Sequence, residues 1–135
     1  MIINTAHAGE SKKAPVYTYS GQHRLTDQGN GNWLLELLTS GTLTFQELNS
    51  FRRAEACGVG GGGSGNSYDR NLGIGGGGGG GGYMASKRDL RLEAGRAYQV
   101  TIGDGGLCDV NGNNGDGRPT SISGILTAPG GSQGG

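Results

Sequence analysis

The residues best suited to chemistry in this chain are two histidines and two cysteines, and they form no recognisable catalytic or metal-binding pattern. Cys57 and Cys108 are isolated from each other in the sequence. A zinc site would need further ligands, and only His7 and His23 are available, both far upstream. Neither histidine has a nucleophile or a carboxylate cluster to act with. The sequence therefore predicts no enzyme and no cofactor.

The two cysteines allow two interpretations. Nothing in the sequence indicates an oxidising compartment, which favours two buried, small, apolar side chains. The alternative is a disulfide between Cys57 and Cys108 that closes a long loop.

Two loop motifs also lack the residues that their chemistry requires. The stretch that begins at Asp109 looks like the start of a calcium loop, but Asn114 stands where the loop needs Gly and Thr120 where it needs Glu. The pattern Gly-x-Gly-x-x-Gly occurs within residues 75–82, yet no strand and helix surround it, and no glycine run ends in Gly-Lys-Ser/Thr. We interpret the Asp and Asn residues as turn formers, and we expect no metal site and no nucleotide site.

Composition excludes two further classes of partner. The chain has 135 residues, of which 11 are basic and 11 acidic, so its formal net charge is zero and a nucleic-acid partner is not expected. It contains neither an export signal nor an apolar stretch of about 20 residues, so we expect no membrane insertion. Gly accounts for 32 residues and the hydrophobic fraction is 32%, which leaves a thin core. Backbone hydrogen bonds or association with other chains must therefore supply an unusual share of the stability.

The glycine runs at residues 60–65 and 75–82 say most about the architecture. A flexible tether normally mixes Ser with Gly, whereas the second run is eight consecutive glycines. The alternative is a packed bundle of extended left-handed helices of the polyproline II type, in which bare backbones come close enough to bond laterally. We favour the packed interpretation. The glycines assigned to its core are Gly60, Gly61, Gly62, Gly75, Gly78 and Gly79.

Short alternating segments elsewhere predict β-strands. Residues 1–15 are polar and mixed, and we expect an N-terminal arm that is mobile or serves for docking, followed by one glycine-rich β domain over 16–135. Residues 27–32 read as a loop. The expected strands lie at 16–19, 33–39, 42–45, 90–92, 97–102 and 121–127.

The segment from Phe45 to Cys57 is ambiguous. Thr44 with Glu47 is a capping-box pattern, and apolar residues follow at three-residue spacings, which favours a helix. As a strand, residues 54–59 would place small side chains where a crowded glycine layer begins. Local sequence alone favours the helix.

Four motifs in order give the chain a resemblance to a known family. A tryptophan strand, Asn32-Trp33 with its leucines, leads into Thr39-Ser40-Gly41-Thr42-Leu43-Thr44, and 54–63 reads Ala-Glu-Ala-Cys-Gly-Val-Gly-Gly-Gly-Gly. Residues 97–106 read Ala-Tyr-Gln-Val-Thr-Ile-Gly-Asp-Gly-Gly, and Thr120-Ser121-Ile122 and Ala128-Pro129-Gly130-Gly131 follow. This order resembles the glycine-rich domain of phage and prophage tail proteins, over about residues 30–135.

The resemblance implies the fold and the function. The implied fold is mainly β, a small antiparallel β-sandwich-like body that carries packed, polyglycine II-like loops. Relatives commonly continue with more glycine-rich sequence, so we expect a truncated or minimal version of the domain. The resemblance, and not periodicity, assigns residues 54–59 to a strand. The implied function is that of a virion structural component, located in the phage tail and assembled in the bacterial cytoplasm, that presents or anchors a host-receptor-binding surface. An extracellular or cell-surface structural glycine-rich fragment is the alternative.

The implied partners are other virion proteins, further copies of the chain and a host surface glycan or protein. Residues that could contact a host surface lie beside the glycine runs, since exposed polar and aromatic side chains on rigid supports suit recognition. The candidates are Tyr68, Asp69, Arg70 and Tyr83. The alternative is that the tyrosines only cap the glycine layer and that the charged pair is solvated.

Overall fold

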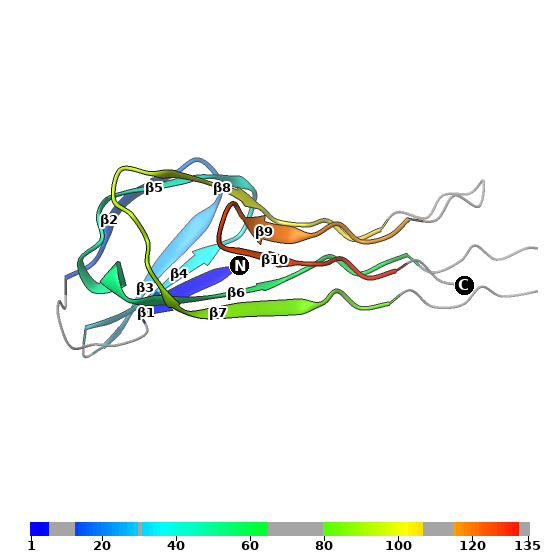
Figure 1. The fold of residues 1–135 in the computed structure, drawn as a ribbon, viewed down its shortest axis with the longest axis horizontal. Coiled ribbons are helices and arrows are strands. Elements are labelled where there is room, and N and C mark those ends of the chain that lie inside the picture. Colours follow the sequence, from blue (N-terminus) through cyan, green and yellow to red (C-terminus); the bar gives the residue numbers. More distant parts are fainter. Residues whose placement is uncertain (6–12, 30, 65–79, 107–114, 133–135) are drawn as a thin grey trace, which may run out of the picture.

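Two antiparallel five-stranded sheets form the body of the protein (Figure 1). The computed structural model describes residues 1–5, 13–29, 31–64, 80–106 and 115–132. One sheet has the strand order β3-β4-β1-β6-β7 and the other has the order β10-β9-β8-β5-β2. The elements are β1 Ile2–Thr5, β2 Val16–Tyr19, β3 His23–Gly29, β4 Asn32–Leu37, β5 Gly41–Glu47, the 3₁₀ turn η1 Asn49–Arg52, β6 Ala54–Val59, β7 Met84–Leu90, β8 Ala97–Thr101, β9 Thr120–Ile122 and β10 Leu126–Ala128. The predicted mainly-β fold is confirmed.

The core lies between the two sheets, because each strand turns alternate side chains inward. In β8, Tyr98 and Val100 are buried while their neighbours are exposed, as the alternation of this segment predicts. A ring contact in the core joins β5 to η1: the rings of Phe45 and Phe51 meet edge to face with centroids 5.9 Å apart. Both side chains are fully buried, so η1 packs against the core.

The strand assignment for residues 54–59 is confirmed, and the helix alternative is wrong. Thr44 and Glu47, which formed the capping pattern, both lie in β5, and the only helical turn nearby is the short η1. β6 pairs with β1 on one side and with β7 on the other, so its backbone groups have partners without a helix. Ala54 and Ala56 are buried, which agrees with small side chains on the inner face.

The expected N-terminal arm over residues 1–15 is wrong for its first part. Ile2–Thr5 form β1, which lies in the middle of its sheet between β4 and β6. Ile3 is fully buried, and Ile2 pairs with Glu36 on one side and Cys57 on the other. Four residues that are weakly apolar by themselves form a strand here because both edges gain a hydrogen-bonded neighbour.

Two turns also differ from expectation. Residues 27–29 of the expected loop belong to β3, whose hairpin to β4 includes Gly31 at φ 79°. The single strand expected over 121–127 is instead the hairpin β9–β10, with Gly124 at φ 74° in its turn. A left-handed residue in a short turn suits glycine, and it allows two very short strands where one longer strand was expected.

Candidate functional site

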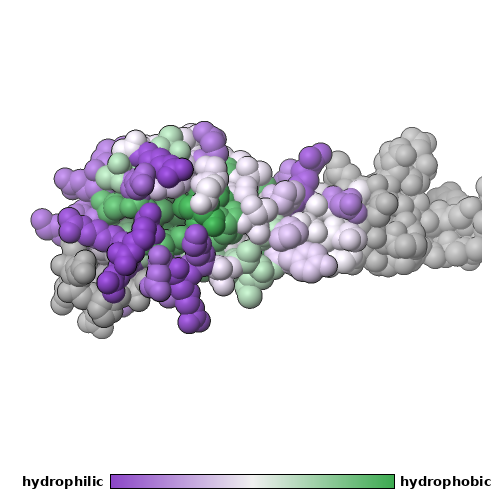
Figure 2. Space-filling view, in the orientation of Figure 1, coloured by the Kyte–Doolittle hydropathy of each residue, from purple (hydrophilic) through white to green (hydrophobic). Residues whose placement is uncertain are grey.

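Five extended segments continue five of the strands away from the body, and we call them the glycine bundle (Figure 1). Residues 60–64 leave β6, 102–106 leave β8 and 129–132 leave β10, while 80–83 enter β7 and 115–119 enter β9. The bundle therefore has three outgoing and two returning segments. Much of its described surface is pale, with a few hydrophilic residues, whereas the body shows strongly hydrophilic and strongly hydrophobic regions (Figure 2).

Hydrogen bonds between neighbouring segments of the bundle repeat every third residue. The N–H of Gly60 donates to the carbonyl of Tyr83 at 3.0 Å, and that of Gly63 donates to Gly80 at 2.8 Å. A β-strand directs every second residue to the same neighbour, whereas a polyproline II helix has three residues per turn. The described part of the bundle thus has the bonding period of polyglycine II.

The same period recurs on the other faces. The donors Gly61 and Ser64 bond the segment 115–119, and Gly80 and Tyr83 bond the segment 129–132. The four bonds are Gly61 N to Arg118 O at 2.9 Å, Ser64 N to Gly115 O at 2.9 Å, Gly80 N to Ser132 O at 2.8 Å and Tyr83 N to Pro129 O at 3.0 Å.

The segment 60–64 is the centre of the bundle, because it bonds all four of the others. Besides the contacts above, its carbonyls accept from Gly106 at 2.7 Å and from Gly131 at 2.8 Å. No hydrogen bond joins 80–83 to 102–106 among the described residues. On that open side the N–H of Gly62 has no backbone acceptor in the described part of the chain.

Close approach of backbones, and not a special φ, explains the glycines of the bundle. The described glycines with positive φ are Gly29, Gly31, Gly95 and Gly124, none of which lies in the bundle. Instead, a Cβ on many bundle glycines would fall 1.8–2.1 Å from a backbone oxygen. These positions are Gly60, Gly61, Gly82, Gly103, Gly106, Gly117, Gly130 and Gly131. Any side chain there would force the segments apart.

Two hydroxyl groups that the sequence analysis missed secure the bundle. The buried Ser64 Oγ accepts from the N–H of Gly115 at 2.9 Å, and the buried Thr120 Oγ1 accepts from Gly103 at 2.9 Å. A serine that interrupts a glycine run was the available signal for Ser64. Thr120 belongs to one of the four motifs, but no local pattern indicated its hydrogen bond, because its partner Gly103 lies elsewhere in the chain.

Among the predicted site residues, the structure places Gly60, Gly61, Gly62 and Tyr83. The three glycines lie in the central segment of the bundle, although Gly62 has room for a side chain: a Cβ there would lie 3.6 Å from its nearest neighbour atom. The others, Tyr68, Asp69, Arg70, Gly75, Gly78 and Gly79, lie outside the described residues.

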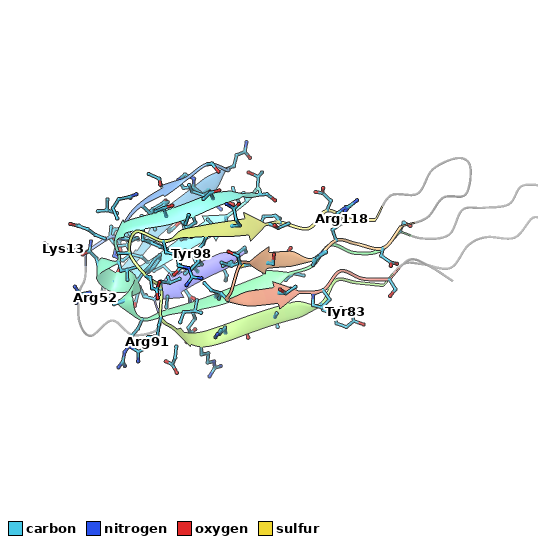
Figure 3. All side chains as sticks on the ribbon, turned by 45° about the horizontal axis from the view of Figure 1, so that its top comes forward. Lys13, Arg52, Tyr83, Arg91, Tyr98 and Arg118 are labelled. Carbon is cyan, nitrogen blue, oxygen red and sulfur yellow. The ribbon has the colours of Figure 1, made fainter. Side chains whose placement is uncertain are left out.

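Tyr83 lies where the body meets the bundle and points outward (Figure 3). Its exposed fraction is 62%, and the next residue, Met84, is 71% exposed. Met84 pairs across the sheet with Val59, which is 54% exposed. These three residues, which we call the neck patch, present apolar side chains to solvent on a backbone fixed by the sheet, as recognition surfaces often do.

Of the residues considered for chemistry, the structure describes His23 and Cys57. His23 packs edge to face against Tyr17 and Tyr19, with ring centroids 5.3 and 5.7 Å away, and burial raises the pKa of both tyrosines. Cys57 carries a free thiol, and Cys108 lies outside the described residues. Within the described ranges, no group of three metal-ligating side chains occurs and no helix is long and apolar enough to span a membrane.

The fold and the bundle define a class: an all-β body that carries a packed polyglycine element. Within this class, the chain belongs to the glycine-rich domain family, whose family model matches residues 38–135. The match covers the stretch from the end of β4 through the bundle. Searches of curated proteins and of solved structures found no match.

Proposed function

We propose that this protein is a non-enzymatic structural component of a phage virion, located in the tail, whose glycine bundle presents or anchors a surface that contacts the host. The observation that carries the proposal is the bundle itself. Five segments bond laterally through their backbones and extend from a β body. Such an element holds its ends in place without a hydrophobic core of its own, which suits a projecting attachment device.

Exposed side chains where the bundle meets the body support the proposed partners. The described bundle carries few side chains, and the exposed neck patch of Val59, Tyr83 and Met84 lies where the bundle joins β6 and β7. We propose that this patch, together with the candidates Tyr68, Asp69 and Arg70, contacts either neighbouring tail proteins or a host glycan or protein. Tyrosine suits both roles, since it combines a stacking face with a hydroxyl group. Association with further copies of the chain would cover apolar surface that the thin core leaves exposed.

Particle composition tests this proposal. Phage particles are induced from the host that encodes the chain and purified by density gradient, and the chain is sought by mass spectrometry and by immunogold labelling. We expect a fixed stoichiometry relative to known tail proteins, with label confined to the tail. A chain found only in the cytosol or secreted without particles would contradict the proposal, and secretion alone would support the extracellular structural alternative.

A further inference from the structure

A hollow of about 200 Å³ lies on the β body, between the end of β7, the start of β8 and the β9–β10 turn. Three basic side chains line it, from Lys87, Arg91 and Arg96, and Asp89 supplies its one carboxylate. The hollow is therefore positively charged in a protein whose formal net charge is zero. None of the residues that line the hollow was a candidate site residue in the sequence analysis.

An irregularity in β7 brings these charges to the hollow. Ala54 and Ala56 of β6 face Leu90 and Lys87, so one residue of β6 opposes two of β7. Asp89, within this bulge, has φ 54°. A bulge changes the direction of the side chains around it, and β7 is an edge strand that no further strand covers in the described sheet. Charged residues protect such an edge from pairing, and here they also line a concave surface.

One of the three cations is held in place, while the other two have no ionic partner among the described residues. The guanidinium carbon of Arg96 lies 5.4 Å from the centre of the Tyr98 ring. Arg96 Nη1 lies 3.6 Å from a carboxylate oxygen of Glu93. The Tyr98 hydroxyl accepts from the N–H of Glu93 at 2.8 Å, which fixes the ring beneath the guanidinium.

Lys87 and Arg91 make no ion pair with any described residue, and Arg91 extends outward from the body (Figure 3). Cations that have no ionic partner among the described residues, beside a fixed guanidinium, suit an anion, because charge-assisted hydrogen bonds are shorter and stronger than neutral ones.

The lining is apolar between the charges. Leu90 and Tyr98 are 3% and 2% exposed, and Ile125 contributes from the turn. Ligand sites commonly combine such an apolar surface with a few polar groups, and the volume here is below the roughly 300 Å³ at which sites for drug-sized ligands begin. We propose that the hollow binds an anionic saccharide, a single sugar ring that carries a carboxylate or phosphate group. The choice of a sugar rests on the proposed function, which places a host surface in reach of the protein.

Titration of the isotope-labelled full chain, followed by amide chemical shifts, tests the inference. The probes are glucuronate, glucose 1-phosphate, neutral glucose and inorganic phosphate. The variants are Arg91→Gln and Lys87→Gln, with Arg118→Gln on the bundle as the matched control, and circular dichroism checks that each folds. We expect both anionic sugars to shift Tyr98, Arg96 and Gly124 with saturation, glucose to bind at least about tenfold more weakly, and each hollow variant to lose about tenfold in affinity. Arg118→Gln should bind like the wild type.

Several results would overturn the inference: no saturable shift with either anionic sugar, equal binding of glucose, or unchanged affinity in both hollow variants. Inorganic phosphate that binds as tightly as glucose 1-phosphate would reveal an adventitious anion only and would also overturn it. These results would not decide whether the chain is part of a phage particle, since the titration uses the isolated chain. Absence from tail particles would likewise leave a positive titration standing.

Discussion

Gly82 approaches Gly60 so closely that a Cβ on Gly82 would fall 1.8 Å from the Gly60 carbonyl oxygen. At the preceding glycine, Gly81, no atom lies within 4 Å of the position that a Cβ would take. Adjacent residues of one segment therefore differ completely in their tolerance of a side chain. A polyglycine II bundle requires this pattern, because successive residues face different neighbours.

Alanine substitution at these two positions should have opposite outcomes. Gly82→Ala should lower the free energy of unfolding by about 1–3 kcal/mol through overpacking. Gly81→Ala should be neutral or should stabilise by about 0.4–1 kcal/mol, because the unfolded chain loses freedom at a residue whose native φ is not positive. Thermal and urea unfolding of both variants measure these changes in the free energy of unfolding. A mobile tether would tolerate both changes equally, and that result would contradict the packed bundle.

Amide hydrogen exchange should reproduce the three-residue period along the central segment. Gly60, Gly61 and Gly63 donate to backbone carbonyls at 2.8–3.0 Å, whereas Gly62 donates to none in the described chain. We expect slow exchange at the three bonded amides and fast exchange at Gly62, measured by NMR on the isotope-labelled chain. Uniformly fast exchange across the segment would contradict the lateral bonding, and protection at alternating residues would indicate a β-strand instead.

Ser64→Ala should loosen the bundle near its described outer end. The Ser64 Oγ is the acceptor for the N–H of Gly115, and the serine is 7% exposed, so alanine would leave a donor unpaired. We expect a loss of about 1–3 kcal/mol in the free energy of unfolding and faster amide exchange at Gly115. The control is Ser132→Ala, an exposed serine of the bundle, whose effect should stay within about 0.5 kcal/mol. Equal effects of the two variants would show that the hydroxyl contact contributes nothing.

The first strand supplies a second matched pair of variants. Ile3 is fully buried between the sheets, so Ile3→Ala should cost about 2–5 kcal/mol of unfolding free energy. Ile2 faces the other way and is 38% exposed, so Ile2→Ala should cost well below that range. Chemical denaturation, followed by the fluorescence of Trp33, measures the unfolding free energy of both variants. If Ile3→Ala unfolded like the wild type, β1 would be a loose arm and its central place in the sheet would be wrong.

The strands that the sequence predicted best are those whose pattern is complete within a few residues. In β8, Tyr98 and Val100 alternate with polar neighbours, and one buried face suffices to produce that pattern. The glycine runs likewise indicated close contact between backbones, because a residue with a Cβ would keep the backbones further apart. For Ala54–Val59 the local signals conflicted, and the resemblance to a family decided correctly.

Other features depended on partners distant in the sequence. Ile2–Thr5 look like part of a polar arm, and they become a central strand only because β4 and β6 supply hydrogen bonds on both sides. The host-contact candidates Tyr68, Asp69 and Arg70 stay predictions, since they lie outside the described residues.

The sequence by itself determined several short alternating strands and favoured packed glycines, since both follow from what each residue type permits locally, and its ordered motifs carried the resemblance that implied a mainly β body. Tertiary structure alone decided which segments became neighbours. Ser64 shows the reason: its hydroxyl binds an N–H 51 residues away, and no local pattern in the chain encodes the choice of that partner. Which backbones meet depends on the order of strands in the two sheets, and that order is fixed by burial and pairing over the whole domain.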